Sequence, residues 1–231
     1  MTVDIGIIGA MVPEVEAIIA ALDNHECECV SGIDFHTGKI GAKTVAVAKC
    51  GIGKVFAAIC AEIMILKYSP DLLVNTGVGG ALAAGLSTGD IVIADSLCQH
   101  DMDTSPIGDP KGLVSGINVI YFESDKRASE ILLSSAAELG LTARLGRIAT
   151  GDKFIASSAD KDRIIADFSA DACEMEGCAI AQTAFVNNTP FAVVRAISDS
   201  ADGEATMDYP TFLGIASRNS TNLTLSLVNK W

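Results

Sequence analysis

Carboxylates at well-separated positions are the first residues of the sequence that could do chemistry. Glu14 stands where a helix begins, Glu174 and Glu176 precede a run of small residues, and Asp199 follows an apolar run. Taken singly, each has a simpler reading, such as an acidic side chain that stabilises a helix start. Two carboxyl groups in one site can instead split a glycosidic or N-glycosidic bond, because one activates water while the other protonates the leaving group.

The elements around these residues alternate between strand and helix. Runs rich in Ile and Val predict strands, and helical periodicity lies between them. This order favours an α/β domain with a mainly parallel sheet, in which ligands bind at the carboxyl ends of the strands. The predicted strands are Val3–Ile8, Thr44–Lys49, Asp71–Asn75, Asp90–Ala94 and Phe191–Ile197, and the predicted helices are Pro13–Leu22, Val55–Tyr68, Asp125–Leu139, Gly177–Val186 and Thr211–Val228.

Four polar or glycine-rich segments follow these strands and are expected to share one edge of the sheet. Neither Gly77-Val78-Gly79-Gly80 nor Gly53-Lys54 completes a nucleotide-binding glycine motif, so a dinucleotide or ATP site is disfavoured. The carboxylates, rather than the glycines, therefore carry the chemical prediction. The four segments are Gly9–Ala17, Cys50–Val55, Asn75–Ala81 and Arg195–Asp202.

Composition limits the class of protein. The chain has 231 residues, a formal net charge of −13, and only 19% charged residues, which excludes a disordered chain or a coiled coil. The acidic balance without a basic cluster argues against nucleic acid as a partner. No linker or repeat divides the chain, so we expect one domain over residues 1–231.

Cysteine usage and hydropathy point to the cytoplasm. The start of the chain lacks a basic segment before its apolar run, and no stretch is long enough to span a membrane. Seven cysteines, most of them in apolar runs, indicate buried thiols rather than disulfides, and zinc spacing is lacking. The segment Val55–Tyr68 is apolar almost all round, which fits a core helix and a subunit interface equally well.

Eight segments, in order and at similar spacing, resemble the bacterial 5′-methylthioadenosine/S-adenosylhomocysteine nucleosidases of the purine nucleoside phosphorylase superfamily. The resemblance runs over essentially the whole chain and is weakest at Gln99–Tyr121. The most specific segments read GIIGAM, EME and RAISD. The eight are Ile5–Glu16, Ser31–Ile40, Cys50–Val55, Pro70–Gly77, Gly89–Asp95, Thr150–Ile155, Cys173–Gly177 and Pro190–Asp202.

The resemblance implies a three-layer α/β/α fold around a central mixed, mostly parallel sheet, and a homodimer. It implies hydrolysis of the adenine–ribose bond of 5′-methylthioadenosine and S-adenosylhomocysteine, and of 5′-deoxyadenosine as well, with no metal or cofactor. The products would be adenine and a thioribose, as in methionine salvage and methyl-cycle detoxification. Small nucleosides are therefore the expected partners, with no nucleic acid and no membrane.

The resemblance also implies roles for individual residues. Glu14 would activate the attacking water and Asp199 would protonate adenine N7, with Ser198 orienting Asp199. Arg195 would hold the arrangement of carboxylate and water. The remaining substrate-binding residues would be Glu174 and Glu176, with Glu176 on the ribose hydroxyls, Met175 under the sugar, Phe154 and Ile155 at the adenine, and Met11, Ile52 and Tyr209 along the ribose and 5′ side.

Two departures from the family pattern bear on specificity. Val78 stands where many members carry a serine, and is expected to line the site without a hydroxyl. The tract His100–Ser115 lacks the aromatic residues that often cover the partner subunit's 5′ pocket, and Ile107 would take their place.

Three other functions stay open. An aminofutalosine-type nucleoside hydrolase would share the fold and the carboxylates. A phosphate-dependent purine nucleoside phosphorylase is disfavoured, because the loop after the first strand carries Glu14 and no arginine to face phosphate. A non-catalytic nucleoside-binding protein would have no need of a carboxylate that activates water.

Overall fold

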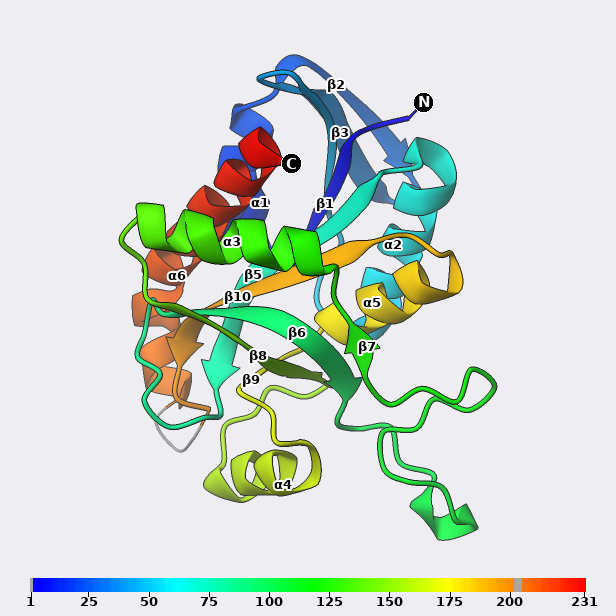
Figure 1. Cartoon of the computed structure of the whole chain (residues 1–231), viewed down its shortest axis with the longest axis vertical. Helices are drawn as coiled ribbons and strands as arrows, with labels where there is room; N and C mark the ends of the chain where they lie inside the picture. The colour runs from blue at the N-terminus through cyan, green and yellow to red at the C-terminus, as the bar shows by residue number, and fades with distance from the viewer. Residues whose placement is uncertain (1, 202–204) are drawn as a thin grey trace.

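A mixed sheet forms the centre of the computed structural model, which describes residues 2–201 and 205–231, without the side chains of residues 205–211 (Figure 1). The strand order is β10-β6-β8-β9-β5-β1-β4-β3-β2, with β7 paired to β6 and β10 paired also to β5. The strands are β1 (Ile5–Gly9), β2 (Asp23–Val30), β3 (Ile33–Ile40), β4 (Lys43–Lys49), β5 (Leu72–Ala81), β6 (Ile91–Gln99), β7 (Phe122–Glu123), β8 (Ala143–Thr150), β9 (Ala172–Glu174) and β10 (Phe191–Asp199).

Helices cover both faces of this sheet, which confirms the α/β/α layering. α1, α3 and α6 pack on one face, and α2 and α5 pack together on the other (Figure 1). Each face has its own apolar core, so the strands between them are buried on both sides. The helices are α1 (Val12–Ala20), α2 (Lys54–Tyr68), α3 (Lys126–Glu138), α4 (Ser158–Phe168), α5 (Gly177–Val186) and α6 (Ala205–Lys230), with a 3-10 turn at Ser105–Ile107.

The pairing of the strands is less parallel than the sequence predicts. β1 pairs in parallel with β4 and β5, as do β5 with β10 and β8 with β6 and β9. Antiparallel pairs join β2 to β3, β3 to β4, β5 to β9, β6 to β7 and β6 to β10. The mixed character is confirmed, but parallel pairs do not predominate. Tight turns reverse the chain between β2, β3 and β4, and β6 also pairs antiparallel with the distant β10.

Predicted elements fall in the right places, and the differences have local causes. The predicted strand Asp71–Asn75 continues as β5 to Ala81, through the glycines that we expected to form a turn. β2 was missed because its sequence, DNHECECV, is polar and lies exposed along the sheet edge. β3, β7, β8, β9 and α4 were also missed, and α6 begins before the predicted Thr211.

α2 combines a buried face with an exposed apolar face. Ala57, Cys60, Ala61 and Met64 are buried against the sheet. On its other side Val55 is 70% exposed, and Phe56, Ile59 and Leu66 are exposed with it. The sequence alone left core and interface open for this helix, and in the single chain it has one face of each kind.

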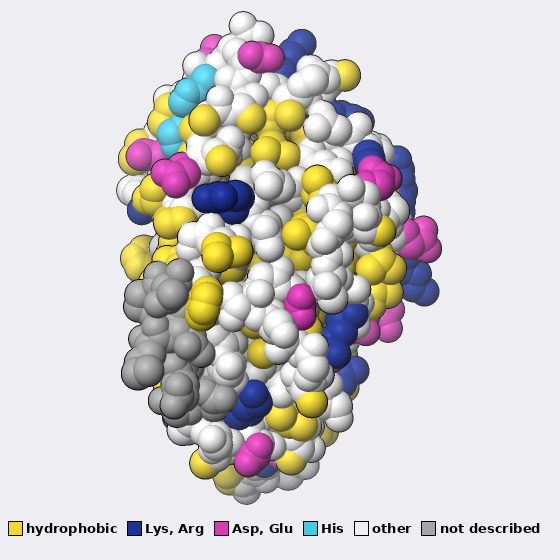
Figure 2. Space-filling model, turned by 90° about the vertical axis from the view of Figure 1, so that its left-hand side faces the viewer, with side chains coloured by type: hydrophobic (Ala, Val, Ile, Leu, Met, Phe, Trp, Pro, Cys, Tyr) yellow, Lys and Arg dark blue, Asp and Glu magenta, His cyan; other side chains and the backbone are white. Residues whose placement is uncertain are grey.

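The surface and the helices show two further properties. On the face that Figure 2 shows, the Lys and Arg side chains of the described residues are interspersed with acidic and apolar side chains. Among the described residues, no helix has both the length and the apolar character needed to cross a membrane.

Candidate active site

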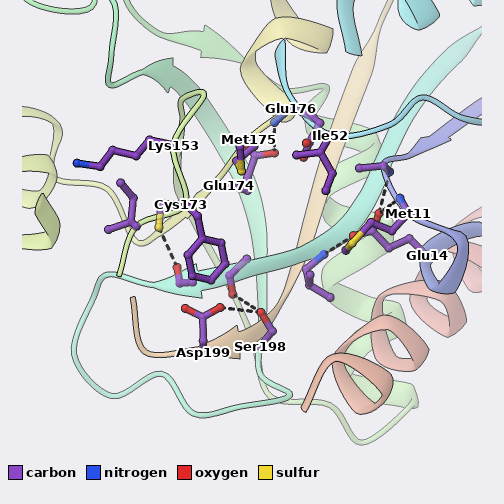
Figure 3. Close-up of a pocket in the computed structure, with 16 residues that line it drawn as sticks. Met11, Glu14, Ile52, Lys153, Cys173, Glu174, Met175, Glu176, Ser198 and Asp199 are labelled. Carbon is purple, nitrogen blue, oxygen red and sulfur yellow. Dashed lines mark hydrogen bonds between the residues drawn. The ribbon is translucent and has the colours of Figure 1, made fainter. Parts of the chain in front are cut away.

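A cavity of about 200 Å³ lies at the carboxyl ends of β1, β5 and β10. Glu14 and Met11 approach it from one side, Asp199 and Ser198 from another, and Glu176 and Ile52 from a third (Figure 3). The fold therefore brings the separated carboxylates into one cavity. Its wall is made of Ala10, Met11, Glu14, Ile52, Val78, Gly79, Gly80, Lys153, Phe154, Ile155, Cys173, Glu174, Met175, Glu176, Ser198 and Asp199.

Glu14 is held by backbone amides from two strand ends. Its Oε2 accepts hydrogen bonds from the amides of Ala10 (2.7 Å) and Met11 (2.8 Å), and its Oε1 accepts one from Val78 (3.1 Å). A side chain at Gly77 would put its Cβ only 2.6 Å from Oε1, so the glycine allows this close approach. Glu14 is thus fixed in one orientation.

Burial decides the proton affinity of Glu14. The side chain is 3% exposed, and this loss of solvent raises the pKa of Glu14, although Arg195 and the backbone amides partly oppose the rise. A carboxylate with a raised pKa is a stronger base than an exposed one. Glu14 therefore has both the position and the basicity to take a proton from water.

Glu174 is fully engaged with other protein groups. Its carboxylate accepts hydrogen bonds from the amides of Glu176 (3.0 Å) and Gly177 (2.6 Å), from the Thr150 hydroxyl, and from Arg195 in a buried ion pair. These partners occupy both of its oxygens. Through these contacts Glu174 stabilises the turn before α5.

Arg195 is buried behind the cavity and does not line it. Its guanidinium also donates to the side chain of Asn75 and to the backbone of Val194, at 2.9 Å. Burial acts to lower the pKa of Arg195, but the negative charges of Glu174, Glu176 and Glu14 together outweigh it and raise the pKa. Arg195 therefore lies where it can hold the carboxylates in place, as their counter-charge.

Glu176 keeps a free oxygen beside the cavity. Its Oε1 accepts a hydrogen bond from the Gly53 amide at 2.8 Å. Burial, together with the charge of Glu174, raises the pKa of Glu176 to about 7. The group can therefore accept hydrogen bonds from a polar ligand at neutral pH once it loses its proton.

Asp199 lies at the end of β10, on another side of the cavity from Glu14. Its Oδ2 accepts a hydrogen bond from the Ser198 hydroxyl (2.9 Å), and its Oδ1 accepts one from the Ala201 amide (2.9 Å). Ser198 thus contacts the carboxylate that it is expected to orient. The two catalytic candidates therefore face one cavity from opposite segments of the chain.

Apolar residues make up much of the remaining wall. Met11, Val78, Ile155 and Met175 line the cavity as expected, and Phe154 and Ile52 line it while staying 43% and 56% exposed. Val78 contributes its amide to Glu14, and that bond needs no hydroxyl on the side chain.

Besides Arg195, two predicted residues are not seen among the described residues that line the cavity. Ile107 is 82% exposed, on a loop that projects from the body of the chain (Figure 1). The side chain of Tyr209 lies outside the described residues.

Sequence reasoning missed several lining residues and one support. Ala10, Gly79, Gly80, Lys153 and Cys173 line the cavity, and Asn75 binds Arg195 from behind. The missed lining residues each lie within two positions of a predicted site residue, and this closeness in the chain was the signal available. In the part of the chain that the structure describes, no group of three acidic, His or Cys side chains is arranged to hold a metal.

Comparisons with known proteins agree with this geometry. The profile of the phosphorylase superfamily matches residues 4–229. A protein of Haemophilus influenzae (strain PittGG), named 5′-methylthioadenosine/S-adenosylhomocysteine nucleosidase, is 41% identical over 228 residues, covering 98% of this chain and 99% of its own. The chain belongs to these nucleosidases of the phosphorylase superfamily. A protein of the same name from Staphylococcus aureus (strain MRSA252) is 40% identical over 227 residues, covering 98% of this chain and 99% of its own.

Solved structures place the chain in the same family. The Neisseria meningitidis nucleosidase in complex with methylthio-immucillin-A superposes with a TM-score of 0.96 at 34% identity, covering 98% of this chain and 99% of that one. Futalosine hydrolase of Helicobacter pylori superposes with a TM-score of 0.94 at 33% identity, covering 98% and 97%. The fold is therefore shared by nucleosidases of two named specificities.

Proposed function

We propose that the protein hydrolyses the adenine–ribose bond of 5′-methylthioadenosine and S-adenosylhomocysteine, and of 5′-deoxyadenosine, as one nucleosidase domain spanning residues 1–231. The observation that carries the proposal is the pair of carboxylates, Glu14 and Asp199, that face one cavity from different sides. The family assignment supports the choice of nucleoside. The products are adenine and the free sugar, which is a thioribose from the two thioether nucleosides and 5-deoxyribose from 5′-deoxyadenosine.

Glu14 activates the attacking water in this proposal. Breaking the bond leaves an oxocarbenium-like sugar, which a water molecule attacks as it gives up a proton. Three backbone amides hold the Glu14 carboxylate, and its raised pKa suits it to receive that proton. Arg195 acts from behind, because its guanidinium, held by Glu174, supplies positive charge near Glu14 and Glu176.

Asp199 protonates the leaving base. Adenine becomes electron-rich as the bond lengthens, and a proton at N7 makes it a better leaving group. The Ser198 hydroxyl and the Ala201 amide fix the Asp199 carboxyl toward the cavity. Phe154 and Ile155, a short distance along the wall, receive the adenine ring in this arrangement.

Glu176 and Met175 bind the sugar. The Gly53 amide occupies one oxygen of Glu176, which leaves the other for the ribose hydroxyls. Met175 lines the cavity beside it, as Met11, Ile52 and Val78 do along the 5′ side. Tyr209 is proposed on the same side from the resemblance alone.

Futalosine-type hydrolysis is the second candidate, favoured by the structural match to the Helicobacter pylori enzyme. Both reactions use the same carboxylates, so the site geometry does not separate them. Steady-state rates with methylthioadenosine, adenosylhomocysteine, 5′-deoxyadenosine, aminofutalosine, adenosine and inosine test the choice. The highest kcat/KM is expected for the two thioether nucleosides, and a clear preference for aminofutalosine would reverse the assignment.

Turnover is expected to proceed in phosphate-free buffer and to yield a free sugar. A phosphorylase needs cations facing a phosphate dianion. Lys153 is the one basic side chain among the described lining residues, and its Nζ lies 2.8 Å from Asp160. Adenine release with and without millimolar phosphate, with analysis of the sugar, measures this. Accumulation of a sugar 1-phosphate would remove both the hydrolase assignment and the role of Glu14.

A homodimer is expected, with a mass of about twice the 23.9 kDa of the chain. The exposed apolar face of α2, at Val55, Phe56, Ile59 and Leu66, supplies the contact area. We propose that Ile107, on its projecting loop, closes the 5′ pocket of the partner. Light scattering and sedimentation measure the mass, and a fully active monomer would contradict both the interface and the shared pocket.

A further inference from the structure

Lys54, the first residue of α2, connects the start of that helix with two other segments of the chain. Its Nζ donates hydrogen bonds to Asp101 Oδ1 (2.6 Å) and to Gln99 Oε1 (3.0 Å). Its backbone amide donates to Asp152 Oδ1 (2.7 Å), and the Asp152 amide donates in turn to Asp101 Oδ2 (2.9 Å). Lys54, Asp101 and Asp152 therefore close a ring of hydrogen bonds, which we call the Lys54 ring.

The ring replaces a cap that α2 cannot make for itself. The cap residue Gly53 has a φ of +101° and no side chain, so it cannot accept from the first amides of the helix. Instead, the carboxylate of Asp152, 98 residues further along the chain, accepts the hydrogen bond of the Lys54 amide. Its negative charge lies at the positive end of the helix. A Cβ at Gly53 would lie 3.1 Å from Asp152 Oδ1, which ties the glycine to this contact.

Two of the segments that the ring joins continue directly into the cavity wall. Ile52 lines the cavity and Gly53 donates to Glu176, immediately before Lys54. Phe154 and Ile155 line the cavity, two and three residues after Asp152. Lys54, Asp101 and Asp152 themselves are absent from the described lining, so the ring can act only through its neighbours.

Electrostatics keeps the ring closed at neutral pH. Burial acts to raise the pKa of Asp101, but the hydrogen bonds from Lys54 and from the Asp152 amide outweigh it and lower the pKa. Asp101 is therefore ionised opposite the Lys54 ammonium. Because both side chains are partly exposed, a pair of this kind adds little to global stability, and its effect is mainly local.

We infer that Lys54, Asp101 and Asp152 are positioning residues, which set the distance between the Ile52 and Phe154 walls and hold Gly53 against Glu176. The inference rests on the proposed function, since it takes those walls to bind the adenine and the ribose. Asp101 also begins the segment that leads to the projecting loop of Ile107. The ring thus connects the loop of Ile107, the start of α2 and the segment that holds Phe154 and Ile155.

Lys54→Met is expected to raise the KM for methylthioadenosine about tenfold while kcat changes less than about threefold, because misplaced walls weaken substrate binding. The matched control is Lys67→Met, at the other end of the same helix, where the ammonium pairs with Glu28 at 2.6 Å, away from the cavity. Asp101→Asn is expected to repeat the Lys54 effect, and the double variant to add little to it. A KM of Lys54→Met equal to that of Lys67→Met would overturn the inference.

Hydrogen exchange separates this inference from the proposed function, because it needs no substrate. In Lys54→Met, backbone amides of residues 51–55 and 150–156 are expected to exchange faster than in the wild type, whereas Lys67→Met leaves them unchanged. Unchanged exchange in both segments would overturn the ring as a positioning device even if the enzyme cleaves its substrate. Faster exchange in a protein that releases no adenine would uphold the ring while the nucleosidase proposal fails.

Discussion

Asp199→Asn is expected to lower kcat for adenine release by about 100-fold or more, the lower range of a general acid contribution. The amide cannot deliver a proton to the leaving base. Its oxygen can still accept from the Ala201 amide, and its nitrogen still fits beside Ser198, so the fold is expected to persist. Steady-state kinetics with circular dichroism on the same preparation measures both.

Asp162→Asn is a suitable control for this change, because Asp162 lies exposed on α4, away from the cavity wall. It should keep the kcat of the wild type. Near-full turnover by Asp199→Asn, with its fold intact, would remove Asp199 from the mechanism and leave the leaving base without its proposed acid.

Glu14→Gln is expected to lower kcat by a similar factor, about 100-fold or more, because the amide cannot take a proton from water. Its oxygen still accepts from backbone amides, although its NH₂ group faces a donor on the other side. Glu16→Gln, two residues on and exposed, is the matched control and should behave as wild type. Retained turnover in Glu14→Gln would assign water activation elsewhere.

The pH profile gives an independent check on Glu14. A general base must be unprotonated, so activity falls as the pH drops through its pKa. Because burial raises the pKa of Glu14, the acid limb of kcat/KM is expected at a higher pH than an ordinary glutamate, near 4.3, would give. An acid limb at or below that value would contradict the buried base.

The sequence predicts which residues line the site better than it predicts the partners of their side chains. Glu14, Glu176 and Asp199 each sit where an apolar run gives way to polar sequence, and all three line the cavity. Glu174 also lines the cavity, but it pairs with Arg195, which lies within the apolar run of β10 and behind the cavity. Nothing local to either residue indicates that partner, since it comes from 21 positions away.

The sequence by itself determined which segments end at the site, because the change from buried strand to polar turn is written in the local order of residues. The resemblance of those segments also indicated the family that the comparisons confirm. The sequence also determined the alternation of strands and helices and the apolar character of α2, because both follow from the local order of residues.

Only the tertiary structure decided how the segments meet. The extension of β5 through its glycines, the antiparallel pairing of β6 with β10, and the Lys54 ring all join residues far apart in the chain. Such pairings depend on the geometry of the whole sheet and on the burial of charge that it imposes. That burial also raises the pKa of Glu14, a shift that the identity of the residue alone does not indicate.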